Sequence, residues 1–93
     1  MMNVTVELFA LARRLSKAKS VVLELAPGAT LRDVLVKLGD RFPALLGELI
    51  VPGSYDLREP YVFNIDARRV AKNLDEEVRE GENLLLMYVT VGG

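Results

Sequence analysis

Apolar and polar residues alternate in two stretches near the N-terminus. In residues 3–9, Val4, Val6 and Leu8 fall on one side, whereas Phe9 falls with the polar positions on the other. Residues 20–26 alternate in the same way. A period of two residues is typical of a β-strand with one buried face. The connection, residues 10–16, has room for about one helical turn, so the two strands are predicted to form a hairpin.

A helical period begins at Thr30. Thr30 is a favourable N-cap, and Asp33 stands three residues later, where a capping box needs a side-chain acceptor. Four apolar residues recur at helical spacing and predict a buried stripe: Leu31, Val34, Leu35 and Leu38. The sequence therefore predicts one amphipathic helix that covers a sheet.

The end of this helix is marked twice. Gly39 suits a C-cap, and the helix can also continue to Arg41. Phe42 precedes Pro43, and a residue before proline avoids the helical region, so the helix must stop there. Because proline is favoured in a first helical turn, a second short helix is predicted over residues 43–50.

The second half of the chain holds shorter elements. In order they are a loop over 51–60, a strand over 61–65, a turn over 66–69, a brief strand near 70–71, a polar segment over 73–82 and a final strand over 84–91. Gly81 is expected to take a positive φ in the turn before this strand.

Together these elements predict an α+β fold. One mixed sheet of about five strands would be covered by one main helix plus a short second helix, with the first and last strands as neighbours. This is the β-grasp arrangement, the fold of ubiquitin. Residues 1–93 are expected to form a single domain with a flexible C-terminal tail of about 89–93.

Composition removes several classes of function. The formal net charge is −1 without a long basic run, which argues against a nucleic-acid module or a polybasic membrane anchor. The chain has no cysteine and no histidine, which excludes thiolate or imidazole metal sites, cysteine nucleophiles and Ser-His-Asp triads. No apolar run reaches the roughly 20 residues of a membrane span. A soluble cytoplasmic protein that binds no metal or cofactor of its own is the expectation.

The sequence ends in Gly92-Gly93, directly after the predicted strand. Glycine has no side chain to pack, and chain ends are often frayed, so the pair can be incidental. Alternatively, the Gly93 carboxylate is the working group, and the residues before it present it to other proteins. The sequence offers no acid, base or metal ligand set beside it, so whether the chain counts as an enzyme by itself stays open.

Several features, in their order, resemble the small sulfur carriers of the MoaD/ThiS ubiquitin-like family, and most of all the MoaD group, small subunits of molybdopterin synthase. The matching features are Phe9-Ala10, Pro27-Gly28-Ala29-Thr30-Leu31, Phe42-Pro43, Phe63-Asn64, the Glu80-Gly81-Glu82 turn and Gly92-Gly93. The resemblance spans nearly the whole chain.

This resemblance implies a chemistry for Gly93. An E1-like, MoeB-like enzyme would use ATP to adenylate the Gly93 carboxylate, and a sulfur donor protein would convert the adenylate to a thiocarboxylate. The tail would then enter the MoaE-like large subunit of molybdopterin synthase, which transfers the sulfur to a pterin precursor of the molybdenum or tungsten cofactor. Gly92 would let the tail thread a narrow channel.

A docking face is expected beside this tail. Leu84 and Leu86 share one side of the last strand, and if that side is buried, Leu85 and Met87 are exposed beside Phe9. Val89 and Val91 are predicted to add partner contacts. Apolar clusters on small domains often mark interfaces, whereas single exposed apolar residues are ordinary. Arg68 and Arg69 belong either to the rim of this face or to a solvated hairpin tip.

Two alternatives stay open. In the first, the chain is a ubiquitin-like modifier whose Gly93 is joined to lysines of target proteins. In the second, it is a β-grasp interaction module whose Gly-Gly end has no role. The sulfur carrier and the modifier need the same tail, so the sequence alone does not separate these two functions.

Overall fold

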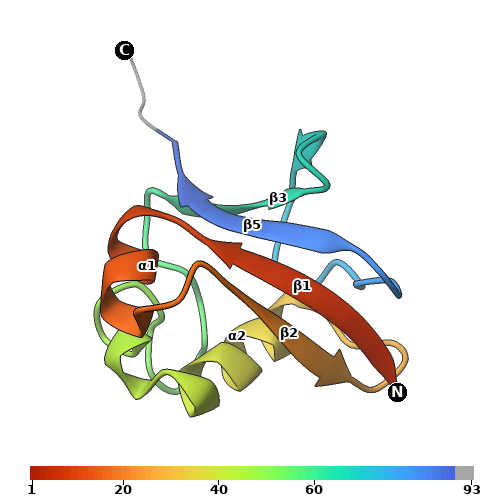
Figure 1. The fold of residues 1–93 in the computed structure, drawn as a ribbon, viewed down its shortest axis with the longest axis horizontal. Helices are drawn as coiled ribbons and strands as arrows, with labels where there is room; N and C mark the ends of the chain where they lie inside the picture. The colour runs from red at the N-terminus through yellow and green to blue at the C-terminus, as the bar shows by residue number, and fades with distance from the viewer. Residues whose placement is uncertain (90–93) are drawn as a thin grey trace.

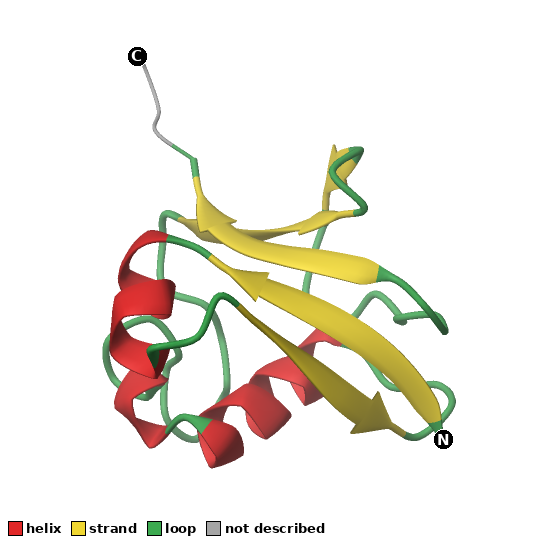
Figure 2. Ribbon diagram, viewed as in Figure 1, coloured by secondary structure: helices red, strands yellow, loops and turns green. Residues whose placement is uncertain are grey.

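The structure is a computed structural model, and it describes residues 1–89. Five strands form one sheet in the order β2-β1-β5-β3-β4. Their bounds are β1 Met2–Leu8, β2 Ser20–Leu25, β3 Tyr61–Ile65, β4 Arg69–Val70 and β5 Asn83–Tyr88. The helices are α1 Ala10–Ser16, α2 Leu31–Arg41 and the 3-10 turn η1 Pro43–Leu45. The α+β prediction is confirmed, and Figures 1 and 2 show the helices together on one side of the sheet.

The sheet is mixed. β1 pairs antiparallel with β2, which confirms the predicted hairpin, and pairs parallel with β5. β3 pairs antiparallel with both β5 and β4. The first and last strands are therefore neighbours at the centre of the sheet, as predicted. None of the helices within residues 1–89 is long and apolar enough to span a membrane.

The core lies between the sheet and α2. The predicted helical stripe, Leu31, Val34, Leu35 and Leu38, is buried, and so is the predicted side of both N-terminal strands. Thr30 and Asp33 form the predicted capping box: the Asp33 N–H donates to the Thr30 hydroxyl, and the Asp33 carboxylate accepts from the Thr30 N–H at 2.9 Å. The cap fixes where α2 begins, and hence how it crosses the sheet.

Two predicted helical segments differ from the structure. Residues 10–16 form a complete short helix, α1, rather than a connection with one turn. The helix predicted over 43–50 is wrong beyond Leu45: only η1 forms, because Leu46 is extended and Gly47 has a φ of +89°. The Gly47 N–H closes a turn by donating to the Ile50 carbonyl at 2.7 Å, so the backbone cannot continue as a helix.

The glycines at the two predicted boundaries behave differently. α2 continues through Gly39 to Arg41, and Phe42 is the C-cap. Gly39 is buried, and a Cβ there would lie 2.9 Å from the Leu46 Cδ2 atom, so its role is close packing. Gly81 has the predicted positive φ, +81°, and its N–H donates to the Asn3 carbonyl, which fixes the turn that leads into β5.

Candidate functional site

The candidate site is built around β5, because this strand leads to the C-terminal residues. β5 lies between β1 and β3 and pairs with both, so neighbouring strands hold it on each side. Its burial alternates: Leu84 and Leu86 are fully buried against the helices, whereas Leu85 and Met87 are partly exposed on the opposite face. The predicted assignment of the two faces is confirmed.

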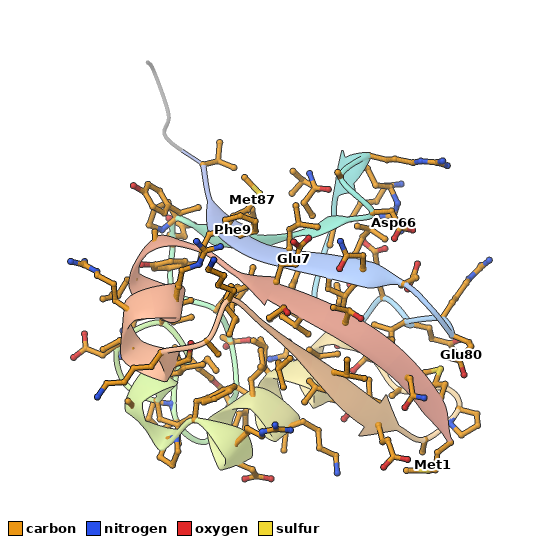
Figure 3. All side chains as sticks on the ribbon, in the orientation of Figure 1. Met1, Glu7, Phe9, Asp66, Glu80 and Met87 are labelled. Atoms are coloured by element: carbon orange, nitrogen blue, oxygen red, sulfur yellow. The ribbon has the colours of Figure 1, made fainter. Side chains whose placement is uncertain are left out.

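Phe9 joins this opposite face at the end of β1. Leu8 is opposite Leu86 in the parallel pairing, and the Phe9 N–H donates to the Leu86 carbonyl at 3.2 Å. The next residue on β5 is Met87, so Phe9 and Met87 continue the two strands beside each other, as Figure 3 shows. The Arg13 guanidinium carbon lies 5.4 Å from the centre of the Phe9 ring, which orients the ring.

A third strand completes the surface. Val62 on β3 is directly opposite Met87 and is partly exposed. Val89 follows β5 and is 43% exposed. We call this surface the outer patch; its members are Phe9, Val62, Leu85, Met87 and Val89. Sequence analysis missed Val62, although Val62 directly precedes Phe63 in a strand whose Phe63 and Ile65 are both buried, so alternation places it on the outer face.

Polar groups border the outer patch along β1 and β5. The Asn83 side-chain amide donates to the Glu7 carboxylate at 2.7 Å, and Glu7 is opposite Leu85 in the register. On the other side of Leu85 stands Asn64, whose Oδ1 is buried without a hydrogen-bond partner in the described part of the chain. A buried acceptor without a donor lowers the stability of the folded state by about 1–3 kcal/mol. The outer face is therefore apolar at the end where β5 finishes and polar at the other end.

The end of β5 is held by neighbouring residues. Tyr88 is opposite Tyr61, and the two rings pack edge to face with centroids 5.9 Å apart. The Val89 N–H donates to the Pro60 carbonyl at 3.3 Å. The strand predicted to reach residue 91 therefore ends at Tyr88 in the described range. Val91, Gly92 and Gly93 lie outside the described residues.

One ion pair of the described residues lies near the β3–β4 turn. Arg69 pairs with Glu76 at 2.9 Å, whereas Arg68 is exposed at the β3–β4 turn. A hydrogen bond from the Lys72 N–H, reinforced by Arg69, lowers the pKa of Glu76. Neither arginine belongs to the outer patch. Arg68 lies at the solvated hairpin tip, and Arg69 belongs to a structural ion pair.

A second ion pair connects α2 to the 51–60 loop. Arg32 donates to the Asp56 carboxylate and, at 2.9 Å, to the Ser54 carbonyl. The hydrogen bond from Arg32 lowers the pKa of Asp56. These contacts stabilise the loop against the helix. Within residues 1–89, no group of three or more Asp or Glu side chains is arranged to hold a metal ion.

Comparison with known proteins decides the family. A model of the ThiS family matches residues 6–93. The chain belongs to the ThiS family. It therefore has the ubiquitin-like fold that serves in sulfur carriers and protein modifiers, which the resemblance implied. No match was found among curated protein sequences.

Solved structures match over nearly the full length of this ThiS-family chain. Small archaeal modifier protein 1 from Haloferax volcanii is 21% identical with a TM-score of 0.83, covering 97% of this chain and 100% of that one. A protein from Pyrococcus furiosus assigned as molybdopterin converting factor subunit 1 is 26% identical with a TM-score of 0.78, at 97% and 100% coverage.

A third structure contains a complex. It is that of BexX with CysO from Amycolatopsis orientalis, in which the matching chain is 22% identical with a TM-score of 0.71, covering 97% of this chain and 99% of that one. The archaeal modifier and the matching chain of the BexX–CysO structure are 21% and 22% identical to the protein. Their likeness to it therefore shows a shared fold only.

Proposed function

We propose that this chain is a cytoplasmic sulfur carrier and the small subunit of a molybdopterin synthase. The observation that carries the proposal is the extent of the family match, which runs through Gly93 and so includes the Gly-Gly end. The described domain is already complete before this end: its sheet finishes at Tyr88 and its core contains no residue beyond Leu86. In this proposal, Gly92 and Gly93 react in the active sites of other proteins.

The proposed chemistry begins at the Gly93 carboxylate. A carboxylate is a poor electrophile, so an E1-like enzyme first joins its oxygen to the α-phosphate of ATP and releases pyrophosphate. A sulfur donor protein then supplies a hydrosulfide equivalent, which forms the C–S bond as AMP leaves. The thiocarboxylate donates this sulfur to a pterin precursor bound by the large synthase subunit. This chain contributes the reacting carboxylate, and the E1-like enzyme is the partner that uses ATP.

Chain length limits where this reaction takes place. Four residues follow Val89, and a fully extended chain spans at most about 3.3–3.6 Å per residue. The Gly93 carboxylate therefore reaches no more than ~14 Å beyond Val89, so any partner's active site must come close to the end of β5. A side chain at Gly92 or Gly93 would widen the tail and restrict its backbone, which favours glycine at both positions.

The outer patch supplies a surface for that approach. Its members surround the end of β5, and Val89 is both a patch member and the last described residue before the tail. Clustered exposed apolar side chains on a small domain mark interaction sites, and methionine adapts to different partners. We therefore assign partner binding by the activating enzyme and the large subunit to the outer patch, together with Val91.

A matched set of C-terminal variants tests the proposal. A chain ending at Val91 lacks the glycines, and a chain with one alanine added after Gly93 keeps them but displaces the carboxylate by about 3.3–3.6 Å. With ATP and the E1-like enzyme, both variants should lose at least ~100-fold in ATP–pyrophosphate exchange, because small misplacements of a reacting group are costly. Both should melt like the unmodified chain. Equal exchange by all three chains would contradict the proposal.

Similarity to small archaeal modifier protein 1 favours a second candidate function, conjugation of Gly93 to target lysines. Trypsin cleaves after Arg79, the last basic residue, so a conjugate would leave residues 80–93 as a branch on the target lysine. Mass spectrometry of cell lysates separates the two functions. Such branches favour modification, whereas a free chain heavier by the difference between sulfur and oxygen favours the carrier.

A further inference from the structure

The two edges of the sheet are protected to different extents. β4 forms one edge and has only two residues, Arg69 and Val70, so it offers little backbone for pairing. β2 forms the other edge and has six residues without proline. No other described segment pairs with its far side, and Figure 1 shows this strand at the margin of the sheet. Open edges of this length are templates for another strand.

The hydrogen-bond pattern identifies which groups of β2 are open. The Leu8 N–H donates to the Lys19 carbonyl at 2.8 Å, so these two residues form a hydrogen-bonded pair of the β1–β2 ladder. Such pairs alternate along antiparallel strands. Counting by two, the N–H and C=O groups of Ser20, Val22 and Glu24 point away from β1. The side chain of Val22 is also 59% exposed.

We infer that a second copy of this chain pairs with this edge, with the two β2 strands antiparallel and centred on Val22. In this register Val22 faces Val22 of the second copy, and Ser20 faces Glu24 of the second copy. All three open residues then lie in hydrogen-bonded pairs, each of which exchanges two bonds, for about six hydrogen bonds in total. The two sheets join into one continuous sheet.

The side chains at this edge favour self-pairing. Two exposed valines meet at the centre, where cross-strand β-branched pairs are favourable. Each Glu24 meets a serine rather than its own equivalent, so like charges are not opposed. A groove of about 410 Å³ between β2 and α2 adds Lys37, Asp40 and Arg41 beside Glu24. These four side chains carry no net charge, so two copies meet without net repulsion.

The self-paired edge leaves the proposed carrier site free. β1 separates β2 from β5, and the outer patch contains no residue of β2. The inference does not depend on the sulfur-carrier proposal, and either can fail alone.

The test measures mass against concentration for the full chain and two lysine variants. Sedimentation equilibrium from about 10 μM to about 1 mM should show the mass rising from 10.3 kDa toward twice that value, since small interfaces bind weakly. Val22→Lys places two lysines opposite each other and should raise the dimer Kd at least ~10-fold. Val70→Lys is the matched control, because Val70 is also an exposed valine on an edge strand, and it should dimerise normally.

Complementary charge and amide exchange make the test specific. A mixture of Val22→Lys and Val22→Glu should recover the dimer that neither variant forms alone. In the unmodified chain, hydrogen exchange at the Ser20, Val22 and Glu24 amides should slow as concentration rises. A monomer throughout the range, a dimer that survives Val22→Lys, or exchange that slows only when an added foreign peptide binds would each overturn the inference. Near-identical circular dichroism of the variants verifies that they fold.

Discussion

The two sides of β5 show how one strand serves two purposes. Leu84 and Leu86 lie under the helices and are fully buried, whereas their neighbours Leu85 and Met87 lie on the outer face and stay partly exposed. All four are large apolar residues, so composition does not distinguish them. What differs is the cover: α1, α2 and η1 all lie on the inner side (Figure 2). The inner side stabilises the domain, and the outer side is available to another protein.

The largest effect should come from the inner side. Leu86→Ala removes a fully buried side chain that no neighbour can replace, and such substitutions cost about 2–5 kcal/mol. Urea unfolding followed by circular dichroism should show this as a lower midpoint with an unchanged slope. A loss below ~1 kcal/mol would mean that the inner side of β5 is not where the fold derives its stability.

A change on the outer side should separate binding from stability. Met87→Asp puts a charge at the centre of the outer patch and should weaken binding to the E1-like enzyme at least ~10-fold, because an unpaired carboxylate in an interface is costly to desolvate. Its effect on unfolding should stay within about 1 kcal/mol.

Val70→Asp is the matched control for this substitution, since it adds the same charge to an exposed residue outside the outer patch. It should leave binding unchanged. A large fall in the melting temperature of Met87→Asp, or equal loss of binding in both variants, would contradict the division between the two sides.

A smaller effect should come from the helix that covers the inner side. Thr30→Ala removes the acceptor for the Asp33 N–H and should cost about 1 kcal/mol. Since Thr30 caps α2 on the inner side of the sheet, whereas the outer patch lies on the opposite face, enzyme binding should not change. Thermal melting with a parallel binding titration gives both readouts; weaker binding would indicate that the cap also shapes the docking face.

The smallest effect should come from the Arg69–Glu76 ion pair, which lies outside the outer patch. The Lys72 N–H and Arg69 hold the pKa of Glu76 below its ordinary value of 4.5. Because the folded-state pKa is lowered, the stabilisation is present above pH 4.5 and is lost as pH falls through the folded-state value. Glu76→Gln should therefore flatten the acid limb of the stability–pH curve by at most about 1 kcal/mol. An unchanged acid limb would mean that this ion pair does not contribute to the stability of the domain.

Sequence patterns predicted most of the fold because its elements bury one side each. Alternation identified β1, β2 and the sides of β5, and the spacing of Leu31, Val34 and Leu38 identified α2. The capping box was visible because it depends on two residues three positions apart. In each case the signal is local, and the tertiary structure agrees with it.

The failures occurred where local signals are short or contradicted. α1 has only seven residues, too few to show a clear helical period, although Ala12 is buried. The helix predicted over 43–50 contains good helix formers, but Gly47 adopts a positive φ that ends it. Val62 was missed because its place beside Met87 depends on the register between two strands, which neither strand reveals alone. For Gly92 and Gly93 the family match, and not their geometry, supports the proposed role.

Intact-mass spectrometry of the chain after reaction with ATP, its E1-like enzyme and a sulfur donor tests the central proposal most directly. The carrier function predicts a product heavier by the difference between one sulfur and one oxygen atom, with fragmentation placing the change on Gly93. The same reaction without ATP should leave the mass unchanged. A chain that keeps its original mass under all conditions, or gains sulfur at a residue other than Gly93, would contradict the proposal.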